Sequence, residues 1–166
     1  MSLCNNSNII KKATFKYLFY VVDRLKTAPD IIADEVEPYG CERMFAGCFN
    51  MKSIDKIDVK KVGNNGFDSM FLNCSSLVNI PSILPATELA SYCYQRMCEN
   101  CTSIVTAPEL SATEVNMCCC NYMFQDCSSL TQAPSILPAT TLAFGCYSSM
   151  FKGCSSLVRA PYLPAP

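Results

Sequence analysis

Histidine and tryptophan are both absent from this chain of 166 residues. Without histidine the chain lacks the commonest general base and metal ligand of proteins, and a Ser–His or Cys–His nucleophile is excluded. No apolar run approaches the 18 residues of a membrane-spanning helix, so we expect no transmembrane segment. No glycine-rich phosphate loop is present either, because Gly63-Asn64-Asn65-Gly66 is typical of a turn. We therefore predict neither an enzyme nor a cofactor-binding protein.

Charge is scarce over most of the chain. The formal net charge is −1, and only nine Asp, Glu, Lys or Arg residues follow residue 62. Polarity in this later part comes from Ser, Thr, Asn and Gln, which suit broad, uncharged contacts. Nucleic-acid binding has little electrostatic support, so we expect no nucleic-acid partner. The acidic run Asp34, Glu35 and Glu37 is best explained as a solvated surface, because a catalytic or calcium site would need more convergent oxygens.

An internal repeat organises the chain. Five segments begin with Met and place Cys four residues later, at Met44, Met70, Met97, Met123 and Met150, with spacings of 26, 27, 26 and 27 residues. Leu18 precedes Met44 by 26 residues and begins a degenerate first repeat, which explains the signal-like apolar run Tyr17–Val22. Such a period predicts a solenoid over 18–166, with repeats starting near 18, 44, 70, 97, 123 and 150. Residues 1–17 are expected to form an N-terminal cap segment.

Each repeat is predicted to contain two short elements, which makes the fold class α/β. A strand should cover Leu130–Ala133, where apolar and polar positions partly alternate. A short helix or pair of turns should cover Leu142–Phe151, because apolar residues fall there at helical spacing and Thr140 can cap them. One further helical turn, with Ile9, Ile10 and Ala13, could cover the first repeat. Short parallel strands would line one face of the stack, and the helices or turns the other.

Two phrases of the repeat resemble a known family. They are Met-Phe-x-x-Cys-x-x-Leu, as in Met123–Leu130, and Leu-Pro-Ala-Thr-x-Leu-Ala, as in Leu137–Ala143. Both are similar to the repeats of BspA-like leucine-rich-repeat surface proteins of Bacteroides-type gut bacteria and their phages. The resemblance covers about Phe15 to Pro166 and implies a right-handed leucine-rich-repeat solenoid of about six repeats. It also implies adhesion at the cell surface. A phage virion or the cytoplasm are the alternatives, because no convincing export signal is visible.

Thirteen cysteines raise the alternatives of metal binding, disulfides and simple packing. We predict a buried structural ladder, because free cysteine behaves as a small apolar side chain and these residues share one repeat position. The ladder comprises Cys48, Cys74, Cys101, Cys127 and Cys154. Cys93, Cys98 and Cys101 have an iron–sulfur-like spacing, but Cys98 merely replaces the Phe of Met-Phe. Zinc sites usually bring two close pairs, which this sequence lacks, so no metal is expected.

A ligand is expected on the strand face, the usual broad contact surface of an open solenoid. The candidate contact stripe is Asn79, Thr106, Thr131, Gln132 and Arg159. A solvated sheet face is the alternative for each of these residues. The aromatic residues Tyr92, Tyr94, Phe144 and Tyr147 could form a second platform, or could simply pack between repeats.

The leading functional hypothesis is a non-catalytic, adhesin-like binding module that recognises a protein or a glycan through the repeat surface. A structural or receptor-contacting protein of a phage virion is the alternative. The last repeat stops partway through its unit and would expose an apolar end, so self-association through this open C-terminal repeat is also expected.

Overall fold

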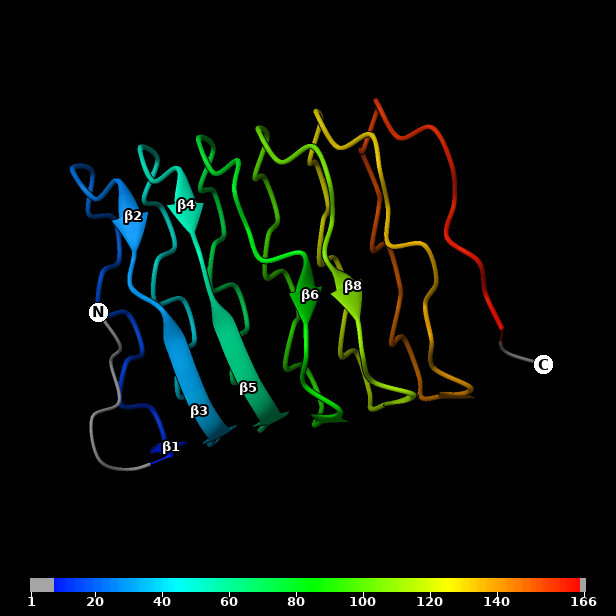
Figure 1. The fold of residues 1–166 in the computed structure, drawn as a ribbon, viewed down its shortest axis with the longest axis horizontal. Coiled ribbons are helices and arrows are strands. Elements are labelled where there is room, and N and C mark those ends of the chain that lie inside the picture. The colour runs from blue at the N-terminus through cyan, green and yellow to red at the C-terminus, as the bar shows by residue number, and fades with distance from the viewer. Residues whose placement is uncertain (1–7, 165–166) are drawn as a thin grey trace.

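The computed structural model describes residues 8–164, which wind into a single stack of coils (Figure 1). Every paired strand runs parallel to its neighbour in the next coil. The solenoid predicted from the repeat is therefore confirmed. The chain winds about five times around the stack, and this winding brings six levels, which we call coils, on top of one another. The strands are β1 (Ile9–Ile10), β2 (Thr27–Ala28), β3 (Ile31–Val36), β4 (Ser53–Ile54), β5 (Ile57–Val62), β6 (Ile83–Leu84), β7 (Glu88–Leu89), β8 (Glu109–Leu110), β9 (Glu114–Val115) and β10 (Thr141–Leu142).

The strands lie in three columns along the stack. In the first column β1, the end of β3, the end of β5 and β7 form a four-stranded sheet, and β9 pairs with β10. The second column begins with β2 and β4 and continues through single bridges that join Ser53 to Asn79, Thr106 to Gln132, and Gln132 to Arg159. The third column contains the pairing of β3 with β5 at Ile31 and Ile57, the pair β6–β8, and the bridge from Ile136 to Tyr162. Because repeat-equivalent residues face one another in each column, side chains of one type stack along the molecule.

A run of consecutive turns, not a helix, closes each coil. Of the two alternatives predicted over Leu142–Phe151, the helix is wrong: that range begins in β10 and continues in turns, and the described residues contain no helix. We call this surface the turn face, and its runs are 12–21, 38–47, 64–73, 91–100, 117–126 and 144–153. The predicted α/β class and the predicted helices of the leucine-rich-repeat solenoid are therefore wrong: the described residues form strands and turns only.

Backbone hydrogen bonding explains why these runs are not helical. Met44 N–H donates within its own coil to Cys41 C=O at 3.2 Å, whereas Phe45 N–H donates to Met70 C=O of the next coil at 3.0 Å. A helix would instead direct every N–H to the carbonyl four residues earlier. Every fourth residue of a run has a positive φ, as at Tyr39, Arg43 and Gly47. This conformation turns the chain so that alternate N–H groups point along the stack.

Stacked side chains fill the interior. The five repeat methionines are all buried, and so are the phenylalanines that follow three of them in the middle coils. The rings of Phe45 and Phe71 stack with centroids 5.7 Å apart and planes inclined by 7°, and Phe19 continues the column at 5.4 Å. Burying one such aromatic or Met side chain contributes about 1.5–3 kcal/mol. The core is therefore a set of continuous columns that no single repeat could bury alone.

The N-terminal segment contributes a strand to the stack. Ile9 and Ile10 form β1, which pairs with Glu35 and Val36 at the end of β3. The helical turn that we expected around Ile9 and Ile10 is thus wrong, because these residues hydrogen-bond along the sheet edge. The boundary between the cap segment and the solenoid near residue 17 stays a prediction.

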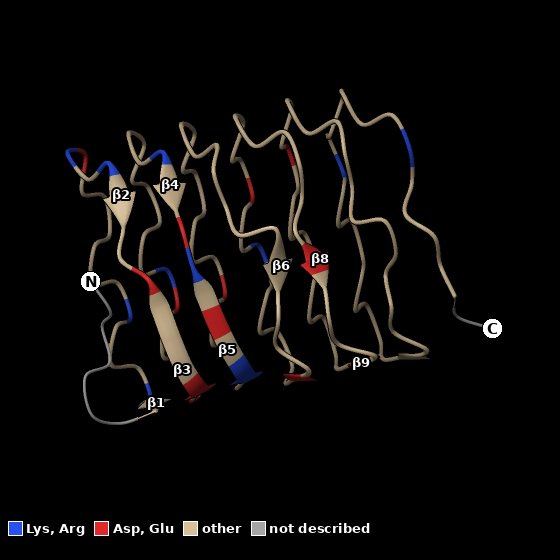
Figure 2. Cartoon of the chain, viewed as in Figure 1, with Lys and Arg blue, Asp and Glu red and all other residues tan. Residues whose placement is uncertain are grey.

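Charged side chains gather on the first coils (Figure 2). Several form ion pairs between adjacent coils, such as Lys61–Glu35 at 3.2 Å and Lys11–Glu37 at 3.0 Å. Asp34 pairs in the same way with Lys60. These pairs are largely exposed, and exposed pairs typically contribute less than about 1 kcal/mol each. The acidic run of the sequence is therefore balanced by lysines from neighbouring coils, whereas the last coils present an almost uncharged surface.

Candidate functional site

An open groove of about 930 Å³ lies on the side of the last three coils. We call it the lateral groove. It lies between the second and third columns, and the Ala-Pro pairs that separate these columns form its floor. The lining residues are Thr106, Ala107, Glu109, Thr131, Gln132, Ala133, Pro134, Ser135, Val158, Arg159, Ala160, Pro161 and Tyr162. In Figure 1 the fifth coil, drawn in orange, steps sideways between the two columns, whereas β4 leads almost straight into β5.

Some polar groups of the lateral groove already form hydrogen bonds with other side chains or backbone groups of the protein. The Glu109 carboxylate accepts hydrogen bonds from Ser135 N–H at 2.7 Å and from the Ser135 hydroxyl at 3.0 Å. Thr106 Oγ1 donates to Gln132 Oε1 at 3.3 Å. Within the described chain, the Arg159 guanidinium enters no ion pair or side-chain hydrogen bond. The groove thus combines fixed hydrogen-bonding groups with an exposed cation.

The structure places four of the five predicted contact residues in this groove. Thr106, Thr131, Gln132 and Arg159 all line it. Asn79 does not, because it lies earlier in the same column, where its carbonyl accepts a hydrogen bond from Ile54 N–H at 3.0 Å. Whether the four residues bind a ligand stays a prediction.

Sequence reasoning missed the opposite wall of the lateral groove, which Glu109, Ser135 and Tyr162 supply from the third column. Tyr162 is two-thirds exposed, at 66%. A signal was present in the sequence: each of these residues directly follows the proline of its repeat.

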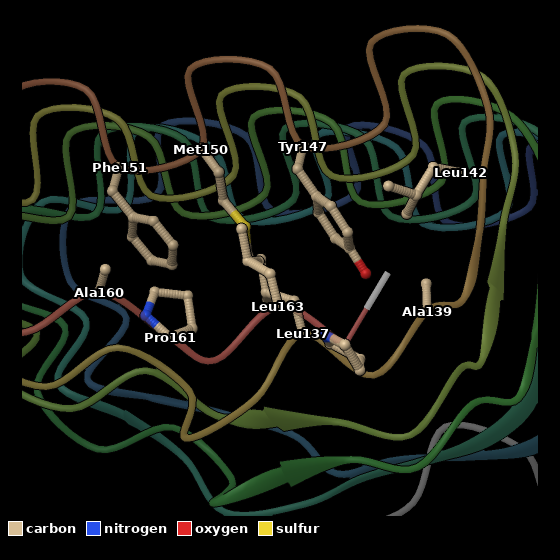
Figure 3. A pocket seen from close by; sticks show the side chains of 10 residues that line it. Leu137, Ala139, Leu142, Tyr147, Met150, Phe151, Ala160, Pro161 and Leu163 are labelled. Carbon is tan, nitrogen blue, oxygen red and sulfur yellow. The ribbon is translucent and has the colours of Figure 1, made fainter. Parts of the chain in front are cut away.

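A second hollow, of about 380 Å³, opens at the C-terminal end of the stack. We call it the end pocket. Its lining is almost wholly apolar, and Figure 3 shows Leu137, Met150 and Leu163 at its centre with the Tyr147 ring beside them. The Tyr147 hydroxyl is buried without a hydrogen-bond partner, and burial raises the pKa of this phenol. The pocket is the apolar interior of the last coil, left open to one side.

The residues of the predicted aromatic platform do not form one surface. Tyr94 is buried and stacks on Phe67 with ring centroids 6.0 Å apart. Tyr147 lines the end pocket. Phe144 is 83% exposed, the most exposed large apolar side chain described. Packing between coils therefore explains Tyr94, whereas Tyr92 lies in the turn run of the fourth coil and only Phe144 and Tyr147 belong to the last coil.

The ladder cysteines share one hydrogen-bond geometry. Each thiol donates to a backbone carbonyl of the preceding coil, at sulfur–oxygen distances of 3.0–3.1 Å. Cys74, for example, donates to Phe45 C=O at 3.1 Å, and its side chain is fully buried. Burial raises the pKa of the Cys74 thiol far above its ordinary value, and it raises the pKa of Cys127 in the same way. These thiols are therefore protonated at neutral pH and act as hydrogen-bond donors.

A separate thiol cluster joins the fourth and fifth coils. The sulfur of Cys93 lies 3.2 Å from that of Cys119, which in turn lies 3.7 Å from that of Cys120. All three side chains are buried, and burial raises the pKa of Cys93. Across residues 8–164, no group of three or more Cys, Asp or Glu residues is arranged to hold a metal ion.

Comparisons with protein-family models, with curated proteins and with solved structures found no match to this chain. In the described part of the chain, no helix is long and apolar enough to span a bilayer.

Proposed function

We propose that this protein is a non-catalytic binding module whose ligand, a protein or a glycan, lies in the lateral groove. The observation that carries the proposal is the convergence of polar side chains from two strand columns on one open groove of about 930 Å³. Ligand sites are typically concave and combine apolar surface with a few well-placed polar groups. The lateral groove has this composition, with an alanine and proline floor between polar walls.

The character of the groove favours an extended, weakly charged ligand. Arg159 is the only cation among the lining residues and Glu109 the only acid, and Glu109 is engaged by Ser135. Hydroxyl and amide groups from Thr106, Thr131 and Gln132 supply further donors and acceptors. Tyr162 adds an exposed ring that can pack against a sugar face or an apolar side chain. Because the groove crosses three coils, it suits a chain-like ligand better than a single compact one.

Rigidity supports the proposal as well. The groove walls are anchored by backbone bonds between coils, such as Leu137 N–H to Tyr162 C=O at 3.0 Å and Ala107 N–H to Gln132 C=O at 2.9 Å. A pre-organised surface loses less conformational entropy when a ligand binds than a mobile loop does.

Two pairs of matched variants test this function. Gln132→Ala and Gln125→Ala each remove one amide from the fifth coil, and Arg159→Ala and Lys152→Ala each remove one cation from the sixth. Only Gln132 and Arg159 line the groove, whereas Gln125 and Lys152 lie on the turn face. A screen of the wild-type chain against glycans and extracellular proteins would identify the ligand by equilibrium binding.

We expect each groove variant to weaken binding at least about fivefold, the loss of one hydrogen bond worth about 1 kcal/mol, and the turn-face variants to bind like wild type. The proposal would be wrong if the groove variants bound as tightly as their controls. A complete absence of binding across the screen would count against it too.

A further inference from the structure

The backbone-to-backbone hydrogen bonds that join adjacent coils on the turn face all run in one direction along the stack. Between every two adjacent coils, five N–H groups of the earlier coil donate to five C=O groups of the later coil, at 2.7–3.2 Å. Phe19 to Met44, Phe45 to Met70, and Phe124 to Met150 are examples of this bond at three levels of the stack. Among the described residues, no backbone-to-backbone bond on this face runs the other way; the two bonds between residues of the turn runs that do, from Ser91 N–H to Asn64 Oδ1 and from Asn100 Nδ2 to Asn73 Oδ1, end on side chains. The turn face is therefore polar, with donors toward the C-terminal end and acceptors toward the N-terminal end.

This polarity leaves a different unpaired row at each end of the stack. At the C-terminal end, five N–H groups have no acceptor within the described chain: those of Gly145, Tyr147, Ser149, Phe151 and Gly153. At the N-terminal end, the repeat-equivalent carbonyls have no donor within the described chain: those of Lys12, Thr14, Lys16, Leu18 and Tyr20. Unpaired backbone groups of this kind are satisfied only by water or by a partner.

The partly buried apolar side chains at the two ends of the stack occupy the same repeat positions. Nearly all of the apolar residues that are only partly buried against the core lie in the first and last coils. They occupy shared columns, so that Phe15 is equivalent to Tyr147, Phe19 to Phe151, and Leu25 to Leu157. Leu18, 49% exposed, is equivalent to Met150, which lines the end pocket. The exposed face of each end therefore has the apolar pattern that an adjoining coil would cover.

We propose that copies of this chain associate head to tail, with the C-terminal coil of one copy against the N-terminal coil of the next. The donor row of one copy then meets the acceptor row of the other in the bonding pattern of every interior coil boundary. Leu18 of the second copy covers the end pocket of the first, and the phenylalanine column continues from Phe151 to Phe19. Two copies joined by identical ends would instead place donors against donors or acceptors against acceptors. The contact is heterologous, so it can repeat to form longer stacks.

Sedimentation velocity over a wide range of protein concentration tests this proposal with three variants. Leu18→Glu places a charge at the N-terminal end, and Leu163→Glu places one in the end pocket, where Leu163 is 60% exposed. Ile83→Glu, at a 51% exposed position of β6 in the middle of the stack, is the matched control. Because all three positions are exposed, the variants should fold, and circular dichroism identical to that of wild type verifies this.

Head-to-tail association predicts a wild-type mass that rises with concentration and an Ile83→Glu variant that behaves likewise. Leu18→Glu and Leu163→Glu alone should each remain monomeric. Their equimolar mixture should form a closed dimer of twice the monomer mass, because each variant keeps one intact and complementary end. Association of Leu18→Glu alone or of Leu163→Glu alone would show contact between identical ends and would overturn the proposal. A wild-type chain that stays monomeric at every concentration, or a mixture that does, would overturn it as well.

Discussion

The ladder cysteines show how one residue type serves every coil of this molecule. Each thiol reaches back to a carbonyl of the preceding coil and occupies little volume beside the stacked rings. Serine could donate the same hydrogen bond, but its hydroxyl would bury a more polar group. Cysteine therefore links adjacent coils through a weak donor at small desolvation cost.

The buried thiols should make stability depend on pH. An unfolded cysteine has a pKa of about 8.5, whereas burial holds the pKa of Cys74 far above that in the folded chain. The unfolded state therefore releases protons first, and the free energy of unfolding should fall as the pH rises above about 8.5. Below that pH the full contribution is present. Denaturant unfolding under reducing conditions, between pH 7 and pH 9.5, measures this change.

The variant Cys74→Ala isolates one ladder thiol. It should be less stable than wild type at pH 7 by about 1–3 kcal/mol, because it leaves a small cavity and removes one of the two hydrogen bonds to the Phe45 carbonyl, which keeps only the bond from Cys48 N–H. Its stability should also fall less steeply at high pH, by up to about 1.4 kcal/mol per pH unit for the one missing proton. Equal slopes for the two proteins would show that Cys74 does not titrate on unfolding.

At the scale of the element, the turn run is the feature that distinguishes this solenoid. Its inward residues in the second coil are Cys41, Met44, Phe45 and Cys48, all buried. This spacing, with steps of three, one and three residues, is also that of an amphipathic helix. A four-residue turn period and a 3.6-residue helical period cannot be told apart over so short a run.

The residue types at the positive-φ positions distinguish a turn run from a helix. One column of the turn face contains Gly47, Asn73, Asn100, Asp126 and Gly153, all with positive φ. These are the residue types that tolerate the left-handed region, and a helix interior would not repeat them at one position. Val21 occupies the same column with φ 56°, which is strained for a β-branched side chain.

Substitutions in this column should therefore have opposite effects. Gly153→Ala should lower the free energy of unfolding by about 1–2 kcal/mol, because alanine disfavours the left-handed region and its Cβ would clash with the Asp126 carboxylate. Val21→Asn should raise it by up to about 1 kcal/mol, since asparagine accepts this conformation at an exposed site. Chemical denaturation of the two variants and wild type provides the comparison. A helical run would give the reverse order, with alanine favoured over glycine.

The sequence predicted the strand columns better than the turn face. The repeat spacing placed Asn79, Thr106, Gln132 and Arg159 in one column, and the bridges of the structure have this register. Four of the five stripe residues also meet in one groove. For the opposite wall, the sequence shows that Glu109, Ser135 and Tyr162 each follow a repeat proline, but not that the chain bends there to bring them beside the second column. Periodicity identifies which residues are equivalent, but not how far the backbone bends between them.

At the scale of the whole molecule, the two halves of the stack differ in how their surfaces are stabilised. The first coils carry cross-coil ion pairs, whereas the last coils carry hydroxyl and amide groups and few charges (Figure 2). The lateral groove and the end pocket both lie in the weakly charged half. The two hollows border one another, because Ala160 and Pro161 line both, so copy-to-copy contact at the C-terminal end would lie beside the lateral groove.

Backbone hydrogen bonds that join the turn face of each coil to that of the next are the feature on which the fold and the head-to-tail proposal both depend. A through-hydrogen-bond NMR coupling experiment tests this directly at Phe45, whose N–H donates to Met70 C=O at 3.0 Å. We predict a coupling between the Phe45 amide nitrogen and the Met70 carbonyl carbon, with equivalent couplings from Phe19 to Met44 and from Phe124 to Met150. A coupling from Phe45 to Cys41, four residues earlier, would show a helix in this run and would contradict the account.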